Sequence, residues 1–158
     1  MAMTAKEYLQ KVYYIDKRIK RLQRRREDIR NDMYSIGSPS GKMDADKVQT
    51  STSGDTMLRL IARVDDLERD IVRELTVLTE VKQIITDQIE ALSDERYRML
   101  LFDRYILLYS WEQVAVDMNY RIKWVYELHG KALQAFAEKW GSQTGKQMCY
   151  DDTVAEHG

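Results

Sequence analysis

The chain has little of what stabilises secreted or sheet-rich proteins. It contains one cysteine, one proline, seven glycines and two histidines in 158 residues. A single thiol, Cys149, can form no disulfide within the chain, and the first residues lack the apolar run of a signal peptide. No segment approaches the roughly twenty apolar residues that a membrane-spanning helix needs. We therefore expect a cytoplasmic protein with no membrane partner.

Catalytic and metal-binding signatures are also scarce. The chain has no glycine-rich phosphate loop and no nucleophile motif, and His129, His157 and Cys149 are too few for a metal site. The carboxylates occur at helix-surface spacing, so we interpret them as solvated faces. We predict that the protein is not an enzyme and uses no metal or other cofactor. His129 borders the core face of its predicted helix, and we expect it to be a hydrogen-bonded structural residue.

Helical periodicity is what the chain has in abundance. Apolar residues recur every three or four positions and charged residues make up 32% of the chain, which favours an all-α fold. Two such seams run over residues 4–36 and 57–92, interrupted at Arg26 in the first and at Glu74 and Gln88 in the second. The first seam consists of Tyr8, Val12, Ile15, Ile19, Leu22, Ile29, Met33 and Ile36.

The two seams match in length and predict a long, coiled-coil-like antiparallel hairpin. Its connection would occupy residues 37–56, which hold the only proline and a Ser/Thr cluster. In an alternative arrangement the seams pack between chains, and the polar residues Arg26, Glu74 and Gln88 fix register or oligomeric state. A homo-oligomer built through the long helices, a dimer or larger, is therefore expected.

A second pattern follows the hairpin. A helix is expected over residues 94–107, and Ser110 is a suitable N-cap for the next one. Asn119 tolerates left-handed backbone geometry and would make a sharp turn into a third helix over residues 122–140. This order is typical of a helix-turn-helix bundle. The predicted domains are the hairpin (4–93), the helix-turn-helix domain (94–140) and a disordered tail (141–158).

The third helix divides into two faces. Val125, Leu128, Ala132 and Phe136 form a core face, and the opposite side carries charged and small residues. Glycine inside a helix lowers stability by up to about 1 kcal/mol relative to alanine, so the presence of Gly130 calls for a structural or functional explanation. Close approach to a DNA backbone and close packing against another helix would both supply one. The open face consists of Lys123, Glu127, Gly130 and Gln134, flanked by Tyr126 and Lys131.

The segment "LFDRYILLYSWEQVAVDMNYRIKWVYELHGKAL" resembles the C-terminal (region four) helix-turn-helix of bacterial sigma factors. It resembles the ArpU/RinA-like transcriptional regulators of phages and prophages still more closely, through "SWE", "MNY" and "VYELHGKAL". With the hairpin and its "DKVQTS" connection, the resemblance covers most of residues 6–133. Leu108 and Tyr109 stand where many relatives have a glycine, in "RY-x-x-G-x-SWE". The sigma-like positions are Leu101, Arg104, Tyr105, Ser110, Glu112, Val114, Ala115, Val125, Ala132 and Leu133.

This resemblance implies a sequence-specific regulator that binds double-stranded DNA in a bacterial host cell, with RNA polymerase as a candidate partner. It does not imply a complete sigma factor, because nothing before Asp94 resembles the region that melts a promoter. The third helix would read the major groove, whose base edges a helix can reach. Glu127 and Lys131 would pair with each other in the alternative interpretation. The expected DNA contacts are Arg121, Lys123, Tyr126, Glu127, Gly130 and Lys131.

A second basic surface is predicted in the first long helix. Residues 1–36 hold ten Lys or Arg against five Asp or Glu, although the formal net charge of the chain is −1. The basic run would either bind DNA without sequence preference or pair with the acidic second helix. Its candidate residues are Lys17, Arg18, Lys20, Arg21, Arg24 and Arg25.

Two other functions fit the same pattern. A DNA-recognition subunit of a packaging machine, similar to a small terminase, would also combine a helix-turn-helix with oligomerising helices and would form a ring. A module that binds RNA polymerase or another regulator through the hairpin would need no DNA. The balanced charge of the third helix keeps this last alternative open.

Overall fold

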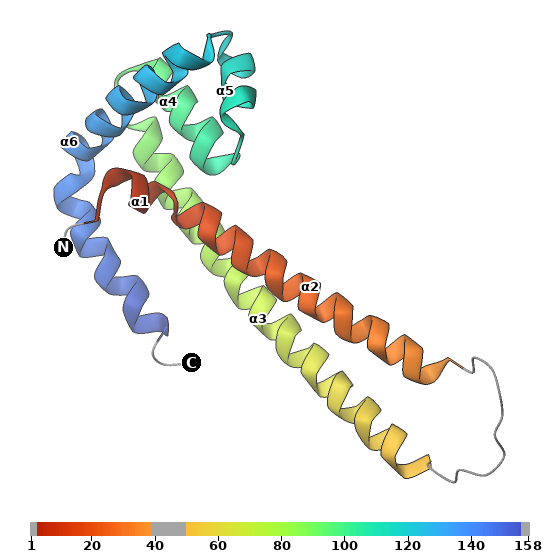
Figure 1. Cartoon of the computed structure of the whole chain (residues 1–158). Helices are drawn as coiled ribbons and strands as arrows, with labels where there is room; N and C mark the ends of the chain where they lie inside the picture. The colour runs from red at the N-terminus through yellow and green to blue at the C-terminus, as the bar shows by residue number, and fades with distance from the viewer. Residues whose placement is uncertain (1–2, 39–49, 156–158) are drawn as a thin grey trace. The chain divides into compact units, whose positions relative to one another are not determined.

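A computed structural model describes residues 3–38 and 50–155, and helices are its only regular elements there (Figure 1). None of the described helices is long and apolar enough to cross a membrane. The all-α prediction is confirmed for this part of the chain. The elements are α1 (Ala5–Leu9), α2 (Lys11–Gly37), α3 (Thr50–Glu90), α4 (Glu95–Leu101), the π-helical turn η1 (Phe102–Ile106), α5 (Trp111–Met118) and α6 (Ile122–Ala155).

The chain divides into two compact units. Unit 1 contains Met1–Ile15 and Leu78–Gly158, and unit 2 contains Asp16–Val77, so α2 and α3 each continue from one unit into the other. The boundary predicted at Asp94 placed both long helices in the hairpin domain, whereas the structure assigns one end of each to unit 1. The reason is burial, because Leu9, Val12, Ile85 and Ile89 are fully enclosed within unit 1.

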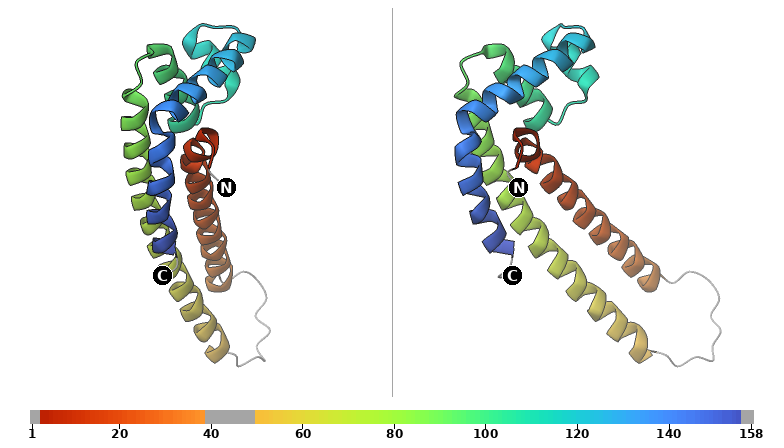
Figure 2. Two further views of the ribbon diagram at one scale, coloured as in Figure 1. Left: turned by 90° about the vertical axis from the view of Figure 1, so that its left-hand side faces the viewer. Right: turned by 60° about the vertical axis from the view of Figure 1, so that its left-hand side comes forward.

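Unit 2 consists of parts of α2 and α3, which run side by side in opposite directions (Figures 1 and 2). Ion pairs set their register. Arg18 Nη1 lies 3.1 Å from Glu74, and Arg30 Nη2 lies 3.0 Å from Glu68. The most deeply buried apolar side chains of this unit are Ile19, Leu67 and Ile71.

The polar residues that interrupt the two seams all have partners within the chain. Arg26 Nη1 donates to both carboxylate oxygens of Glu68, each at 3.1 Å. Glu74 accepts from Arg18, as described above, and the buried Gln88 accepts a 2.8 Å hydrogen bond from the Tyr8 hydroxyl. These contacts fix the register of α2 against α3 and of α1 against α3 inside one molecule.

The first long helix is broken near its start. Thr4 caps α1 through a capping box with Glu7, as its hydroxyl accepts from the Glu7 amide at 3.2 Å. The helix then stops at Gln10 and resumes as α2. Leu9 lies outside the predicted seam, yet its exposed fraction is 0%. The break therefore lets Leu9 enter the core together with its seam neighbours.

Two helices are longer than the sequence pattern predicts. The connection expected over residues 37–56 is shorter, because α3 begins at Thr50, and residues 39–49 lie outside the described part. The tail expected over residues 141–158 is helical as far as Ala155, and 156–158 lie outside the described part. Extending a formed helix adds one hydrogen bond for each residue fixed, so Ser, Thr and single glycines are carried along at small cost.

The helix expected over residues 94–107 changes its winding halfway. Asp94 caps α4 through the Arg96 amide at 2.9 Å, and α4 gives way to η1 after Leu101. In η1 the Leu107 amide donates to the Phe102 carbonyl at 3.0 Å, five residues back. The wider turn buries Asp103, Tyr105 and Ile106 together.

Leu108, two residues after the end of η1, has a left-handed conformation with φ 59°. Such a backbone is strained for a branched, bulky side chain and favours glycine. Leu108 is half-buried, because this reversal takes it out of the helix. The following Tyr109 amide donates to the Asp103 carbonyl at 3.0 Å and closes the turn.

The turn between α5 and α6 is built by local signals. Ser110 caps α5, with its hydroxyl accepting from the Gln113 amide at 3.2 Å, and Asn119 is left-handed with φ 55° and ψ 42°. The Tyr120 amide donates to the Ala115 carbonyl at 2.9 Å, which completes a Schellman motif. The predicted cap and the predicted left-handed asparagine are both confirmed.

The left-handed Asn119 gives a direct test of this turn. Asn119→Ala should lower the free energy of unfolding by about 1 kcal/mol, because a Cβ residue without a polar side chain is disfavoured there. Asn119→Gly should stay within a few tenths of the wild type, since glycine adopts this conformation freely. Urea denaturation followed by circular dichroism measures both. Equal losses in the two variants would contradict the assigned conformation.

Candidate nucleic-acid interface

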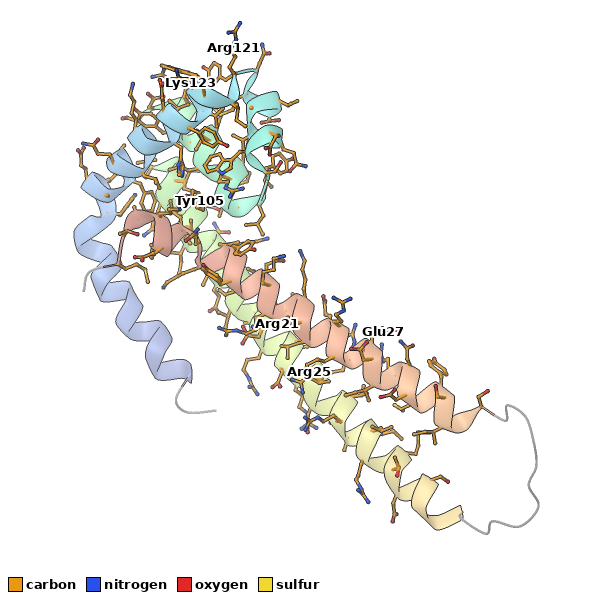
Figure 3. All side chains as sticks on the ribbon, viewed as in Figure 1. Arg21, Arg25, Glu27, Tyr105, Arg121 and Lys123 are labelled. Atoms are coloured by element: carbon orange, nitrogen blue, oxygen red, sulfur yellow. The ribbon has the colours of Figure 1, made fainter. Side chains whose placement is uncertain are left out.

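The first half of α6 presents two contrasting faces. Val125, Leu128, Ala132 and Phe136 are at most 2% exposed and form the core face, as predicted. The opposite face is open to solvent. The structure brings all six predicted contact residues to the surface of unit 1, and Figure 3 shows Arg121 and Lys123 near the start of this helix. The exposed residues are Arg121, Lys123, Tyr126, Glu127, Gly130 and Lys131.

The charges on this face are not neutralised within the described residues. Arg121, Lys123 and Glu127 form no ion pair there, and the pairing considered for Glu127 with Lys131 is absent. The Lys131 ammonium instead lies 5.5 Å from the centre of the Trp124 ring, a cation–π arrangement. The face therefore offers charged groups of both signs to an external partner.

Gly130 has no packing role that the described residues explain. Apart from its two chain neighbours and the backbone of its own stretch of helix, a Cβ atom built at this position would meet no described atom within 4 Å. Close packing of Gly130 against another helix of the same chain is therefore excluded for this part of the structure. Its absent side chain leaves room for an external surface to approach the α6 backbone.

An aromatic cluster holds Tyr126 in place. We use this name for Tyr105, Trp111, Tyr126 and His129. The Trp111 ring meets Tyr126 edge-on at 5.3 Å and His129 at 4.6 Å between ring centres. The Tyr105 hydroxyl lies 2.8 Å from His129 Nε2. Contacts on this scale restrict the rotamers of Tyr126, so its hydroxyl is presented by a rigid support.

Burial sets the protonation of this cluster. The pKa of His129 is lowered to about 4, first by burial and then by the positive charges of Lys6 and Arg104. Burial also raises the pKa of Tyr105 to about 12. Both groups are therefore neutral near pH 7, which agrees with the structural role expected for His129. The cluster was not predicted from the sequence, although Tyr126 and His129 stand three residues apart on one helix.

Asp103 contradicts the interpretation of every carboxylate as a solvated face. It is 6% exposed, and its Oδ2 atom accepts no hydrogen bond within the described residues. Burial raises the pKa of Asp103 to about 7, and a hydrogen bond with Asp117 and the charge of that residue act in the same direction. The π-helical winding of η1 causes this burial, and the sequence carries no clear signal for it.

The second predicted basic surface is partly neutralised. All six of its residues are exposed. Arg18 pairs with Glu74 of α3, and Lys20 pairs with Asp16 of its own helix at 2.8 Å. Arg21, Arg24 and Arg25 form no ion pair with any residue that the structure describes. Pairing with the second helix thus accounts for only part of the run.

The described residues contain no group of His, Cys, Asp or Glu side chains arranged to hold a metal ion. Comparisons of the chain with protein-family models, with curated proteins and with solved structures find no match.

The buried Asp103 makes stability depend on pH. Its pKa is raised on folding, so its contribution is complete below about pH 4, the usual range of a free aspartate, and is lost as the pH rises to about 7. Asp103→Asn should therefore stabilise the protein at pH 8, on the order of 1–3 kcal/mol. Denaturation at several pH values tests this, with the exposed Glu112→Gln as a control. A loss of stability at pH 8 in Asp103→Asn would contradict it.

Proposed function

We propose that the protein is a sequence-specific, double-stranded DNA-binding transcriptional regulator of the phage or prophage type, acting in the cytoplasm of a bacterial host. In this proposal α5, the Asn119 turn and α6 form a helix-turn-helix. The observation that carries it is the open face of α6, where Lys123, Tyr126 and Glu127 are exposed while the opposite face is buried. A helix with one open face of this kind can enter the major groove and read base edges there.

The side chains divide by chemistry. Arg121 and Lys123 would donate to phosphate or to guanine, and Glu127 would accept from the amino group of cytosine. Tyr126 would reach a thymine methyl group or the backbone, with Trp111 fixing its ring. Lys131 would contact phosphate. Gly130 would allow the α6 backbone to approach the DNA closely.

The conformation of Leu108 supports the resemblance to the ArpU/RinA-like regulators. Leu108 occupies the position where many of these proteins have glycine, and its φ of 59° is the conformation that glycine adopts freely. The strained conformation of Leu108 is the one expected if this turn is shared with related proteins that have glycine at the same position. This observation is a backbone conformation, so it does not rely on the sequence motifs of α5 and α6.

Unit 2 would serve oligomerisation or partner binding. Several of its large apolar side chains face solvent, including Tyr34 at 77%, Leu58 at 67% and Val72 at 61% exposure. Where such exposed apolar groups form a contiguous patch, they are typical of a surface that binds another protein. The same surface is consistent with the second candidate function, a module that binds RNA polymerase or another regulator.

DNA recognition is tested on a duplex selected from a random-sequence library, by fluorescence anisotropy across a salt series. Arg121→Glu/Lys123→Glu should weaken binding at least about tenfold and reduce the salt dependence, because two phosphate or base contacts are lost. The matched control Arg59→Glu/Arg63→Glu makes the same charge change at exposed residues of unit 2. No selected sequence at low salt, or an equal loss in the control, would refute the proposal.

Oligomerisation is tested by light scattering during size-exclusion chromatography. The wild type should be a dimer, and Ile61→Glu/Val72→Glu should shift it toward the monomer, because both residues are exposed apolar groups of α3. Ala62→Glu, at an exposed position of the same helix, is the control. A large ring would instead favour the packaging subunit, and a monomeric wild type would contradict oligomerisation through unit 2.

A further inference from the structure

A cavity of about 330 Å³ lies within unit 1, and none of the residues that line it is one of those expected to read DNA. Residues from α1 and the start of α2 form one side of it, and η1, the turn after it and the start of α5 form the other. The volume falls at the low end of the range for small-molecule sites. Its lining residues are Lys6, Gln10, Tyr13, Arg104, Tyr105, Leu108 and Trp111.

The charged residues that line this cavity are all positive. Lys6 and Arg104 both line it, and none of its lining residues is acidic. Neither cation forms an ion pair with a residue that the structure describes. An anion would bind with no competing carboxylate.

The walls are aromatic. Tyr13, Tyr105 and Trp111 line the cavity, and the Arg104 guanidinium lies 4.4 Å from the centre of the Trp111 ring. Arg104 is itself fixed, because its Nη1 donates to the Tyr109 carbonyl at 2.7 Å. A planar ligand would stack against such walls with little loss of side-chain entropy. Figure 3 labels Tyr105 in this part of unit 1.

The backbone that shapes the cavity is irregular. Arg104 and Tyr105 belong to the π-helical η1, and Leu108 lines the same cavity with its left-handed φ of 59°. π-helical turns and strained residues are both enriched at functional sites. The π-helical turn and the left-handed Leu108 therefore both contribute residues to the lining of this basic, aromatic cavity.

We propose that this cavity is a binding site for a small organic anion that carries a flat ring, such as an aryl phosphate or an aryl carboxylate. Lys6 and Arg104 hold the anionic group, the Gln10 amide supplies a further hydrogen bond, and the ring stacks among the three aromatic residues. The site goes beyond DNA recognition, since none of its lining residues is an expected DNA contact.

The probe is phenyl phosphate, with inorganic phosphate and phenol as its two separate halves. Binding to the full chain is measured by isothermal titration calorimetry and by chemical-shift changes of the tryptophan indole groups. Phenyl phosphate should bind at least about tenfold more tightly than either half, because only it uses both the cations and the aromatic walls. Inorganic phosphate binding as tightly as phenyl phosphate would show an unspecific anion site and overturn the proposal.

Two variants locate the site. Lys6→Gln should weaken phenyl phosphate binding about tenfold by removing one charge-assisted contact, and Gln10→Glu should weaken it further by adding a negative charge. Lys6 is exposed and Gln10 is half-buried, so both variants should fold. Arg59→Gln removes one positive charge at an exposed position outside the cavity and should leave the affinity unchanged.

Binding that none of these variants alters would overturn the assignment. If Lys6→Gln weakens DNA binding and phenyl phosphate does not bind at all, the cavity is a contact for the DNA backbone and the small-ligand proposal is wrong. Failure of the DNA-binding proposal alone would leave the calorimetry with phenyl phosphate unaffected.

Discussion

The hydrogen bond between Tyr8 and Gln88 fixes the arrangement of unit 1. The side-chain oxygen of Gln88 accepts from Tyr8 at 2.8 Å, and its backbone carbonyl accepts from the Trp140 indole at 3.0 Å. The Tyr8 ring packs 6.0 Å from Phe136. A buried amide left without a partner costs about 1–3 kcal/mol, so α1, α3 and α6 must meet at this point. Their meeting also decides which face of α6 is turned outward.

Features that depend on neighbouring residues were predictable from the sequence, whereas features that depend on packing were not. The Ser110 cap, the left-handed Asn119 and the core face of α6 follow from local signals and periodicity, and all are observed. The same periodicity placed the six candidate DNA contacts on an exposed face. The π-helical winding of η1 and the buried Asp103 arise from contacts between helices, which no local pattern encodes. The extents of α3 and α6 were missed because helix propagation overrides weak stop signals.

Trp111 belongs to two surfaces at once. Its ring lines the basic cavity and also supports Tyr126 on the open face of α6. A ligand that moved this ring would alter the support of a residue expected to touch DNA, and by linkage DNA would alter the affinity for that ligand to the same extent. The neutral state of His129 keeps the contact between the two surfaces free of a competing charge near pH 7.

The division of α2 and α3 between the two units bears on how such a protein can change during evolution. The core of unit 1 includes Leu9, Val12, Ile85 and Ile89, which lie in or before helices that continue into unit 2. A genetic exchange that transferred only the segment from Asp94 onward would leave these core positions behind in the donor. The transferred α4, η1, α5 and α6 would fold only in a recipient protein whose own helices supply equivalent core residues. Under the proposed function, a new DNA specificity would be reached more simply by substitutions on the open face of α6, which leave these core contacts in place.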